Sequence, residues 1–154
     1  MKPYADTNVL TRLYLRLPET AVAANLVRQA VIDGDDHPPI TWLHRAEFSN
    51  AIEIHVFLGR QGGHVRVTPE QASAAHAWFG GDLEEQRLFI PAAVDPEELV
   101  FEAGNLSMRH TAKHGFRTYD VMHVGSALLL GCDAFWSFDA KARQLAVLEG
   151  LKVN

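Results

Sequence analysis

The chain has a single cysteine, no long apolar run and no segment of low complexity. Cys132 has no second cysteine with which to form an internal disulfide. It lies in an apolar stretch, which predicts a small buried hydrophobe rather than a reactive thiol. No run approaches the ~18 residues of a membrane-spanning helix, and no cationic segment followed by a hydrophobic stretch marks a secretion signal. We therefore expect a cytoplasmic protein that needs no disulfide and does not enter a membrane.

Basic residues are also too few to mark a nucleic-acid surface by themselves. The 14 Lys and Arg residues face 19 Asp and Glu residues, which gives a net charge of −5 with neutral histidines. This balance argues against broad electrostatic attraction to RNA or DNA. It does not exclude a phosphate substrate, because a divalent cation held by clustered acids would reverse the local charge.

The length and the hydrophobic pattern indicate one globular α/β domain over residues 1–154. Short β-prone runs alternate with longer stretches of 3.6-residue periodicity, which predicts a three-layer α/β/α fold around a mainly parallel sheet. The expected strands cover residues 2–5, 38–41, 88–94, 134–138 and 151–153. The expected helices cover residues 7–16, 19–33, 43–58, 68–87 with a break at Gly80-Gly81, 95–114, 118–130 with Thr118 as its cap, and 140–148.

Two aspartates directly follow predicted strands, in Tyr4-Ala5-Asp6 and Phe138-Asp139. Ligands of open α/β sheets bind beyond the carboxyl ends of the strands, so both carboxylates are expected at one rim. An Asp in this position is also a common N-cap for the next helix, and that alternative remains open for both residues.

Glu47 is predicted on the apolar face of its helix. At 100° per residue, a single arc contains Leu43, Glu47, Asn50, Ala51, Ile54 and Leu58. An ionised carboxylate in such a stripe must be protonated, paired with a cation or bound to a metal. A long-range ion pair is the alternative to a metal site.

Asp120 lies in the first turn of the helix that begins near Thr118, where the helix dipole favours an anion by ~0.3–1 kcal/mol. The helix dipole alone could explain an aspartate at position 120. The rest of this helix is apolar enough to be buried, which would bring Asp120 to the same rim as Asp6. Four converging acids would repel one another unless cations intervene.

Such a cluster suits oxygen coordination of Mg²⁺ or Mn²⁺. The metal could activate water for phosphodiester hydrolysis, and a second ion could assist the leaving oxygen. We therefore predict that Asp6, Glu47, Asp120 and Asp139 hold one or two ions.

Four segments that contain these acids resemble, in order, the motifs of PIN-domain ribonucleases. They are Asp6-Thr7-Asn8-Val9-Leu10, the stretch from Arg45 to Ala51, the stretch from Tyr119 to Ala127, and the stretch from Cys132 to Asp139. The resemblance spans Tyr4 to about Leu145, and the short length is similar to that of VapC-type toxins of toxin–antitoxin pairs.

The resemblance implies a homodimeric endoribonuclease that is silenced by a small cognate antitoxin. It also implies that Asp6, Glu47 and Asp120 are the core ligands, that Asp139 is a more variable fourth acid, and that Asn8 and Ser137 support the cluster. The family more often has a threonine near the last acid, so Ser137 is a departure from its pattern.

Other functions remain open. A phosphatase of the haloacid dehalogenase type also begins with a strand and an Asp, but it needs a second Asp where this chain has Asn8. A non-catalytic PIN-like binding module and a housekeeping RNA-processing nuclease are further alternatives. An adjacent small gene that encodes an antitoxin would distinguish a toxin from a housekeeping nuclease.

The glycine-rich segment from Gly59 to Thr68 is predicted to be the most flexible connection, and its Arg60, His64 and Arg66 are candidates for RNA binding. His110 and His114 could bind a metal, although a solvated helix end is the expectation. His123 could face the acids or be a satisfied core histidine, and Asp133 is expected to be a turn residue.

Overall fold

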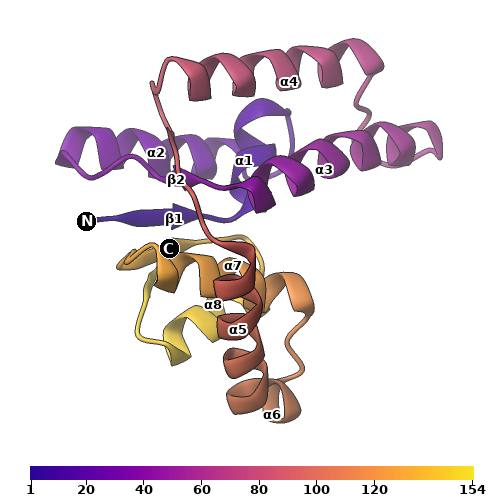
Figure 1. Cartoon of the computed structure of the whole chain (residues 1–154). Coiled ribbons are helices and arrows are strands. Elements are labelled where there is room, and N and C mark those ends of the chain that lie inside the picture. Colours follow the sequence, from indigo (N-terminus) through magenta and orange to yellow (C-terminus); the bar gives the residue numbers. More distant parts are fainter.

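The computed structural model describes residues 1–154. Figure 1 shows the helices in two groups, with α1 to α4 on one side of β1 and α5 to α8 on the other. The strands are β1 Pro3–Ala5, β2 Pro39–Ile40, β3 Ile90–Pro91, β4 Ala134–Trp136 and β5 Lys152–Val153. The helices are α1 Thr7–Tyr14, α2 Thr20–Asp33, α3 Trp42–Arg60, α4 Pro69–Glu84, α5 Pro96–Leu106, the π-helix Ser107–Thr111, α6 Ala112–His114, α7 Thr118–Leu129 and α8 Ala140–Leu148. None of these helices is both long enough and apolar enough to span a lipid bilayer.

All strand pairs are parallel, as predicted, but the strands form two small sheets. One has the order β1-β4-β5 and the other pairs β2 with β3. The strand expected over 88–94 shrinks to Ile90–Pro91. Its partner β2 begins at Pro39, and prolines have no N–H to donate, so this ladder cannot extend far.

The two layers of helices pack on opposite faces of β1 and β4. Ala5 and Trp136 belong to a core that lies among α1 to α4, whereas Tyr4 and Phe135 belong to a second core among α5, α7 and α8. Successive residues of a strand point to opposite faces, so this division follows from the strand itself. It confirms the expected α/β/α arrangement.

Two details differ from the sequence-based prediction. Helix α4 runs unbroken through Gly80 to Glu84, because Phe79 and Leu83 are buried on both sides of the glycine pair and hold the helix in place. The residue that caps α7 is Arg117 rather than Thr118, and its backbone N–H donates to Asp120 at 2.8 Å. This bond places the Asp120 carboxylate at the beginning of the helix.

Candidate active site

All four acids singled out in the sequence line one cavity of about 320 Å³. Asp6 follows β1 and Asp139 follows β4, and the two strands lie side by side. Glu47 comes from the second turn of α3 and Asp120 from the first turn of α7. The structure therefore brings together side chains from opposite ends of the chain, from Asp6 to Asp139.

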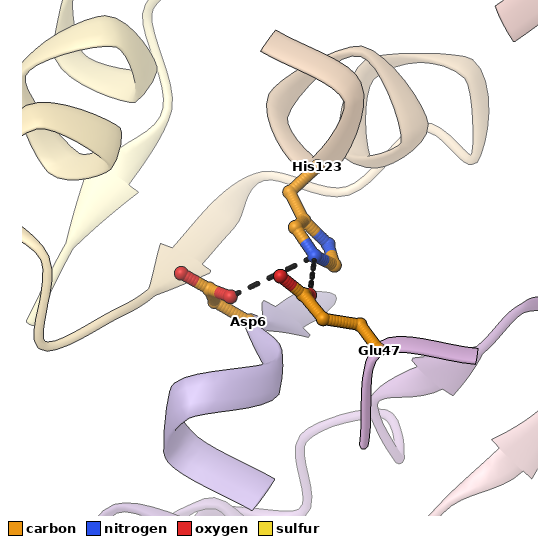
Figure 2. A group of neighbouring side chains, drawn as sticks. All are labelled: Asp6, Glu47 and His123. Atoms are coloured by element: carbon orange, nitrogen blue, oxygen red, sulfur yellow. Dashed lines mark hydrogen bonds and ion pairs between the residues drawn. The ribbon is translucent and has the colours of Figure 1, made fainter. Parts of the chain in front are cut away.

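The innermost group of the cavity consists of Asp6, Glu47 and His123 (Figure 2). Each residue has one potential ligand atom within 4.8 Å of the others. The Nε2 atom of His123 lies 2.5 Å from Glu47 Oε2 and 3.8 Å from Asp6 Oδ1. Its Nδ1 shares a 2.8 Å hydrogen bond with the Tyr4 hydroxyl, so the imidazole is held between the sheet and the carboxylates.

Asp6 is fixed by polar side chains from two segments. Its Oδ2 accepts hydrogen bonds of 2.7 Å from both the Asn8 amide and the Ser137 hydroxyl. Ser137 in turn accepts the backbone N–H of Asp139 at 2.9 Å, and Asn8 accepts that of Phe138 at the same distance. Asn8 and Ser137 thus link the end of β1 to the loop after β4.

Burial and charge oppose each other within the inner group. Burial raises the pKa of Asp6, and the charge of His123 offsets only part of that effect. Burial also acts to raise the pKa of Glu47, but the hydrogen bond and charge of His123 outweigh it, so this pKa is lowered. Burial acts to lower the pKa of His123, but Asp6 and Glu47 outweigh it and raise this pKa. Glu47 and His123 therefore favour a carboxylate–imidazolium pair.

Arg117 contacts the other two acids of the cavity, Asp120 and Asp139. Its guanidinium lies 2.6 Å from Asp139 Oδ2 and 3.6 Å from Asp120 Oδ2. Asp139 also caps α8 by accepting the N–H of Lys141 at 2.7 Å, just as Asp6 caps α1 through the N–H of Asn8. Asp6 and Asp139 therefore each cap a helix and also line the cavity.

Glu47 does not lie in the middle of a buried stripe. The buried residues of α3 are Leu43, His44, Phe48, Ile52 and Val56, whereas Ile54 is 45% exposed and Leu58 is 47% exposed. Ile54 and Leu58 face outward, whereas Val56 lies on the buried face, so the expected arc was wrong there. Glu47 lies at the edge of the buried face, with 27% of its side chain exposed and His123 as its partner.

His44 is a structural part of the site that the sequence analysis missed. It is fully buried, accepts the Thr41 N–H at 3.1 Å and contacts the Ala5 carbonyl through Nε2 at 3.0 Å. Burial lowers its pKa, which keeps the ring neutral. The signal was a capping pattern, with His44 three residues after the N-cap Thr41 where Glu or Gln is usual. The contact ties the start of α3 to the end of β1, and so places Glu47 beside Asp6.

The other singled-out residues lie outside this cavity. His64 and Arg66 line a separate hollow beside α4, and Arg60 lines neither of the two. His110 pairs with Glu149, and His114 shares a 3.4 Å contact with Gln144.

The cysteine and the turn aspartate behave as expected. Cys132 is buried, which raises the pKa of its thiol to about 11. Asp133 accepts the Lys2 N–H at 2.9 Å, so it closes the turn before β4.

No protein-family model and no curated protein sequence matches the chain. Solved structures do match it over almost its whole length. The structure of VapBC2 from Rickettsia felis bound to a DNA fragment from its promoter matches with a TM-score of 0.67 and 12% identity, and covers 100% of this chain and 98% of that one. The chain has a PIN-like fold. FitAcB from Neisseria gonorrhoeae matches this fold with a TM-score of 0.62 and 13% identity over 98% of this chain and 95% of that one.

VapC20 of Mycobacterium tuberculosis, a toxin that cleaves the sarcin–ricin loop, has the same PIN-like fold. It matches with a TM-score of 0.60 and 15% identity over 93% of this chain and 94% of that one. Sequence identities this low carry the fold and not the chemistry, which depends on the residues of the site. In this chain the four acids stand at the carboxyl ends of parallel strands and the adjoining helix starts.

Proposed function

We propose that the chain is a metal-dependent endoribonuclease that hydrolyses RNA phosphodiester bonds. The observation that carries this proposal is the single cavity in which Asp6, Glu47, Asp120 and Asp139 meet. Clustered carboxylate oxygens are suited to holding a divalent cation near a phosphate. The PIN-like fold supports the same function by analogy.

The residues of the cavity fit a divalent cation. Four carboxylates share the cavity with two guanidiniums, those of Arg12 and Arg117, and with the imidazoles of His55 and His123. Burial lowers the pKa of His55, so negative charge exceeds positive charge even when His123 is protonated. Asp6 and Glu47 would hold the ion, with Asp120 and Asp139 as the remaining oxygen donors. Oxygen ligands suit Mg²⁺ and Mn²⁺, and a nitrogen from His123 would favour Mn²⁺. When bound, the cation would supply positive charge to the phosphate and make water more acidic.

The side chains themselves would orient the substrate. Asn8 and Ser137 hold Asp6 in one rotamer through Oδ2, which leaves Oδ1 on the side of His123, 3.8 Å from its Nε2. Arg117 is 71% exposed at the mouth of the cavity and can exchange its contact with Asp139 for one to an RNA phosphate.

Cleavage of a total-RNA pool by the purified protein tests this proposal. Discrete fragments are expected with Mg²⁺ or Mn²⁺ and none with EDTA. Asp6→Asn, Glu47→Gln and Asp120→Asn should each abolish cleavage while the protein stays folded. Glu53→Gln is the matched control, because Glu53 lies on the same helix as Glu47 but is 65% exposed. Unchanged cleavage by Asp6→Asn, or the absence of cleavage in every metal, would reject the nuclease.

We also propose that the nuclease is the toxin of a toxin–antitoxin pair and binds a small cognate antitoxin. The support is the likeness of the fold to VapBC2, VapC20 and FitAcB. Expression of the wild type should arrest growth, whereas Asp6→Asn should not, and the product of an adjacent small gene should restore growth and copurify with the toxin. Normal growth under strong expression would instead favour a housekeeping nuclease.

A homodimer is the proposed assembly. Val100 and Phe101 on α5 and Met108 on the following π-helix are 65%, 72% and 78% exposed. Exposed apolar side chains close together in the chain favour association. Light scattering should give the mass of a dimer, and Phe101→Glu should reduce it to that of a monomer.

Arg60, His64 and Arg66 remain proposed as auxiliary RNA contacts. Arg66 has no acidic partner, and it lines its hollow together with His64, Arg16 and the exposed ring of Trp78. Alanine at all three proposed positions should weaken RNA binding and flatten its salt dependence. An unchanged salt slope would remove these residues from the RNA-binding surface.

A further inference from the structure

A second hollow, the side groove, opens beside the acid cavity. It has a volume of about 540 Å³ and shares two wall residues, Glu47 and Tyr119, with that cavity. The remaining walls come from the first three turns of α3 and the first two turns of α7 and are Trp42, Leu43, Ala46, Asn50, Thr118 and Met122. The side groove and the acid cavity are therefore neighbours that meet at Glu47 and Tyr119.

Two aromatic rings border the side groove with much of their surface free. Trp42 is 41% exposed and Tyr119 is 56% exposed. The Trp42 indole N–H donates to the Val94 carbonyl at 3.0 Å, so the ring is held in place and its polar atom is satisfied. Fixed and exposed aromatic faces are what unpaired nucleobases stack on.

A polar side chain stands next to these rings. Asn50 is exposed, and its amide makes no hydrogen bond within the chain. An amide offers a donor and an acceptor side by side, which matches the edge of a base. Trp42 also borders a neighbouring hollow with Arg45, a cation without an acidic partner. Trp42 and Arg45 precede Glu47 on α3 and Asn50 follows it, so these groups flank the Glu47 carboxylate along the helix.

We propose that the side groove binds one unpaired nucleobase of the RNA, next to the phosphate that lies at the acid cavity. This rests on the proposed nuclease function. It makes the substrate class single-stranded or looped RNA, because a duplex keeps its bases stacked and cannot place one between Trp42 and Tyr119. Asn50 would read the edge of that base and set a sequence preference at one position beside the cut. An apolar side chain of a partner protein is the competing occupant, but it would leave Asn50 without a bond.

RNA binding tests the side groove independently of catalysis. The probe is a fluorescein-labelled single-stranded RNA of random sequence in Ca²⁺, which binds oxygen ligands with looser geometry than Mg²⁺. Loss of one stacking contact should weaken binding roughly ten-fold in Trp42→Leu and in Tyr119→Leu. Tyr119→Phe keeps the ring and should bind like the wild type. Phe57→Leu is the matched control, because Phe57 is a 58% exposed aromatic on the same helix as Trp42 and lines neither the acid cavity nor the side groove.

The position of the cut gives a second readout with Mn²⁺. Sequencing of the products should show a base preference beside the cut that Asn50→Ala and Tyr119→Leu flatten while cleavage still requires Asp6. Metal-dependent cleavage with unchanged preference and unchanged RNA affinity would overturn the side groove and leave the nuclease intact. RNA affinity that depends on both rings without any cleavage would overturn the nuclease and leave the side groove. Variants that keep RNA binding but lose inhibition by a partner protein would assign the groove to that partner.

Discussion

One hydroxyl group, that of Ser137, connects the two ends of the candidate site. It donates to Asp6 Oδ2 at 2.7 Å and accepts the N–H of Asp139 at 2.9 Å. Ser137 is fully buried, so water cannot replace either bond. The residue has the polar function that a threonine would have, which accounts for its presence at this position.

Ser137→Ala should therefore lower activity more than it lowers stability. Loss of a group that orients a metal ligand typically costs about 10–100-fold in metal affinity or activity. The unpaired N–H and carboxylate should cost roughly 1–2 kcal/mol of unfolding free energy. RNA cleavage rates and urea unfolding measure the two effects. Ser49→Ala is the control, because the Ser49 hydroxyl is exposed and donates only to the Arg45 carbonyl on its own helix. Equal activity of the two variants would argue against a positioning role for Ser137.

The sequence placed Asp6 and Asp139 correctly because both directly follow short apolar strands, and parallel strands end at one rim. Glu47 was expected at the site because it lies on an apolar arc of its helix, and that reason was partly wrong. Periodicity shows which residues share a face of a helix, but not whether another element covers that face. The capping of α3 by His44 follows a local pattern, but its contact with Ala5 and the contact of Arg117 with Asp139 could not be predicted, because they join distant segments. His123 was left open between two interpretations, and the structure shows that it is both buried and in contact with the acids.

At the scale of an element, α4 shows how packing overrides local propensity. Glycine costs a helix about 1 kcal/mol relative to alanine, which is why a break was expected at Gly80-Gly81. Buried side chains at Phe79 and Leu83 compensate for that cost. Such compensation depends on tertiary neighbours, so the pattern of residues alone could not reveal it.

Gly80→Ala should stabilise the protein by about 0.5–1 kcal/mol, because a Cβ there meets no atom within 4 Å and the unfolded chain loses freedom. Gly34→Ala is the contrasting variant. Gly34 has a φ of 69°, which an alanine adopts only with strain, so that change should destabilise the protein. Thermal unfolding of both variants checks the prediction, and a loss of stability in Gly80→Ala would contradict it.

The end of α8 is joined to the π-helix by Glu149. This carboxylate lies 2.8 Å from Arg109 Nη2 and 2.5 Å from His110 Nε2. Burial acts to raise its pKa, but the hydrogen bonds of His110 and Arg109 outweigh it, so the pKa in the folded state is lowered.

A lowered pKa in the folded state means that Glu149 stabilises the protein above its ordinary pKa of 4.5, and that this contribution is lost as the pH falls through the lower folded value. Glu149→Gln should therefore cost about 1 kcal/mol at neutral pH and progressively less in acid. Urea unfolding of the wild type and of Glu149→Gln across a pH series measures the difference between their unfolding free energies. A difference that stays constant into strong acid would show that packing, not charge, accounts for it.

At the scale of the whole molecule, the acid cavity brings together mutually repelling charges that folding must accommodate. A cation that binds the folded state alone would relieve this repulsion and stabilise the protein. At about 100 times its dissociation constant the gain is roughly 2.7 kcal/mol, which corresponds to a rise in Tm of roughly 5–10 °C for a chain of this size.

Mn²⁺ should therefore raise the Tm of the wild type and of Glu53→Gln, but not that of Asp6→Asn. Thermal scans over a series of MnCl₂ concentrations measure the effect without RNA. The same rise in Asp6→Asn would show that the ion binds somewhere other than the acid cavity.

Pairing of β1 with β4 has a consequence for the protein during its synthesis. The backbone N–H of Asp6 donates to the Trp136 carbonyl, and the Asp6 carboxylate is held by Ser137. A ribosome that has translated as far as α7 therefore carries a chain whose Asp6 carboxylate can meet Asn8 and His123 but still lacks Ser137. The nascent polypeptide cannot complete the acid cavity until β4 and the residues up to Asp139 have emerged from the exit tunnel.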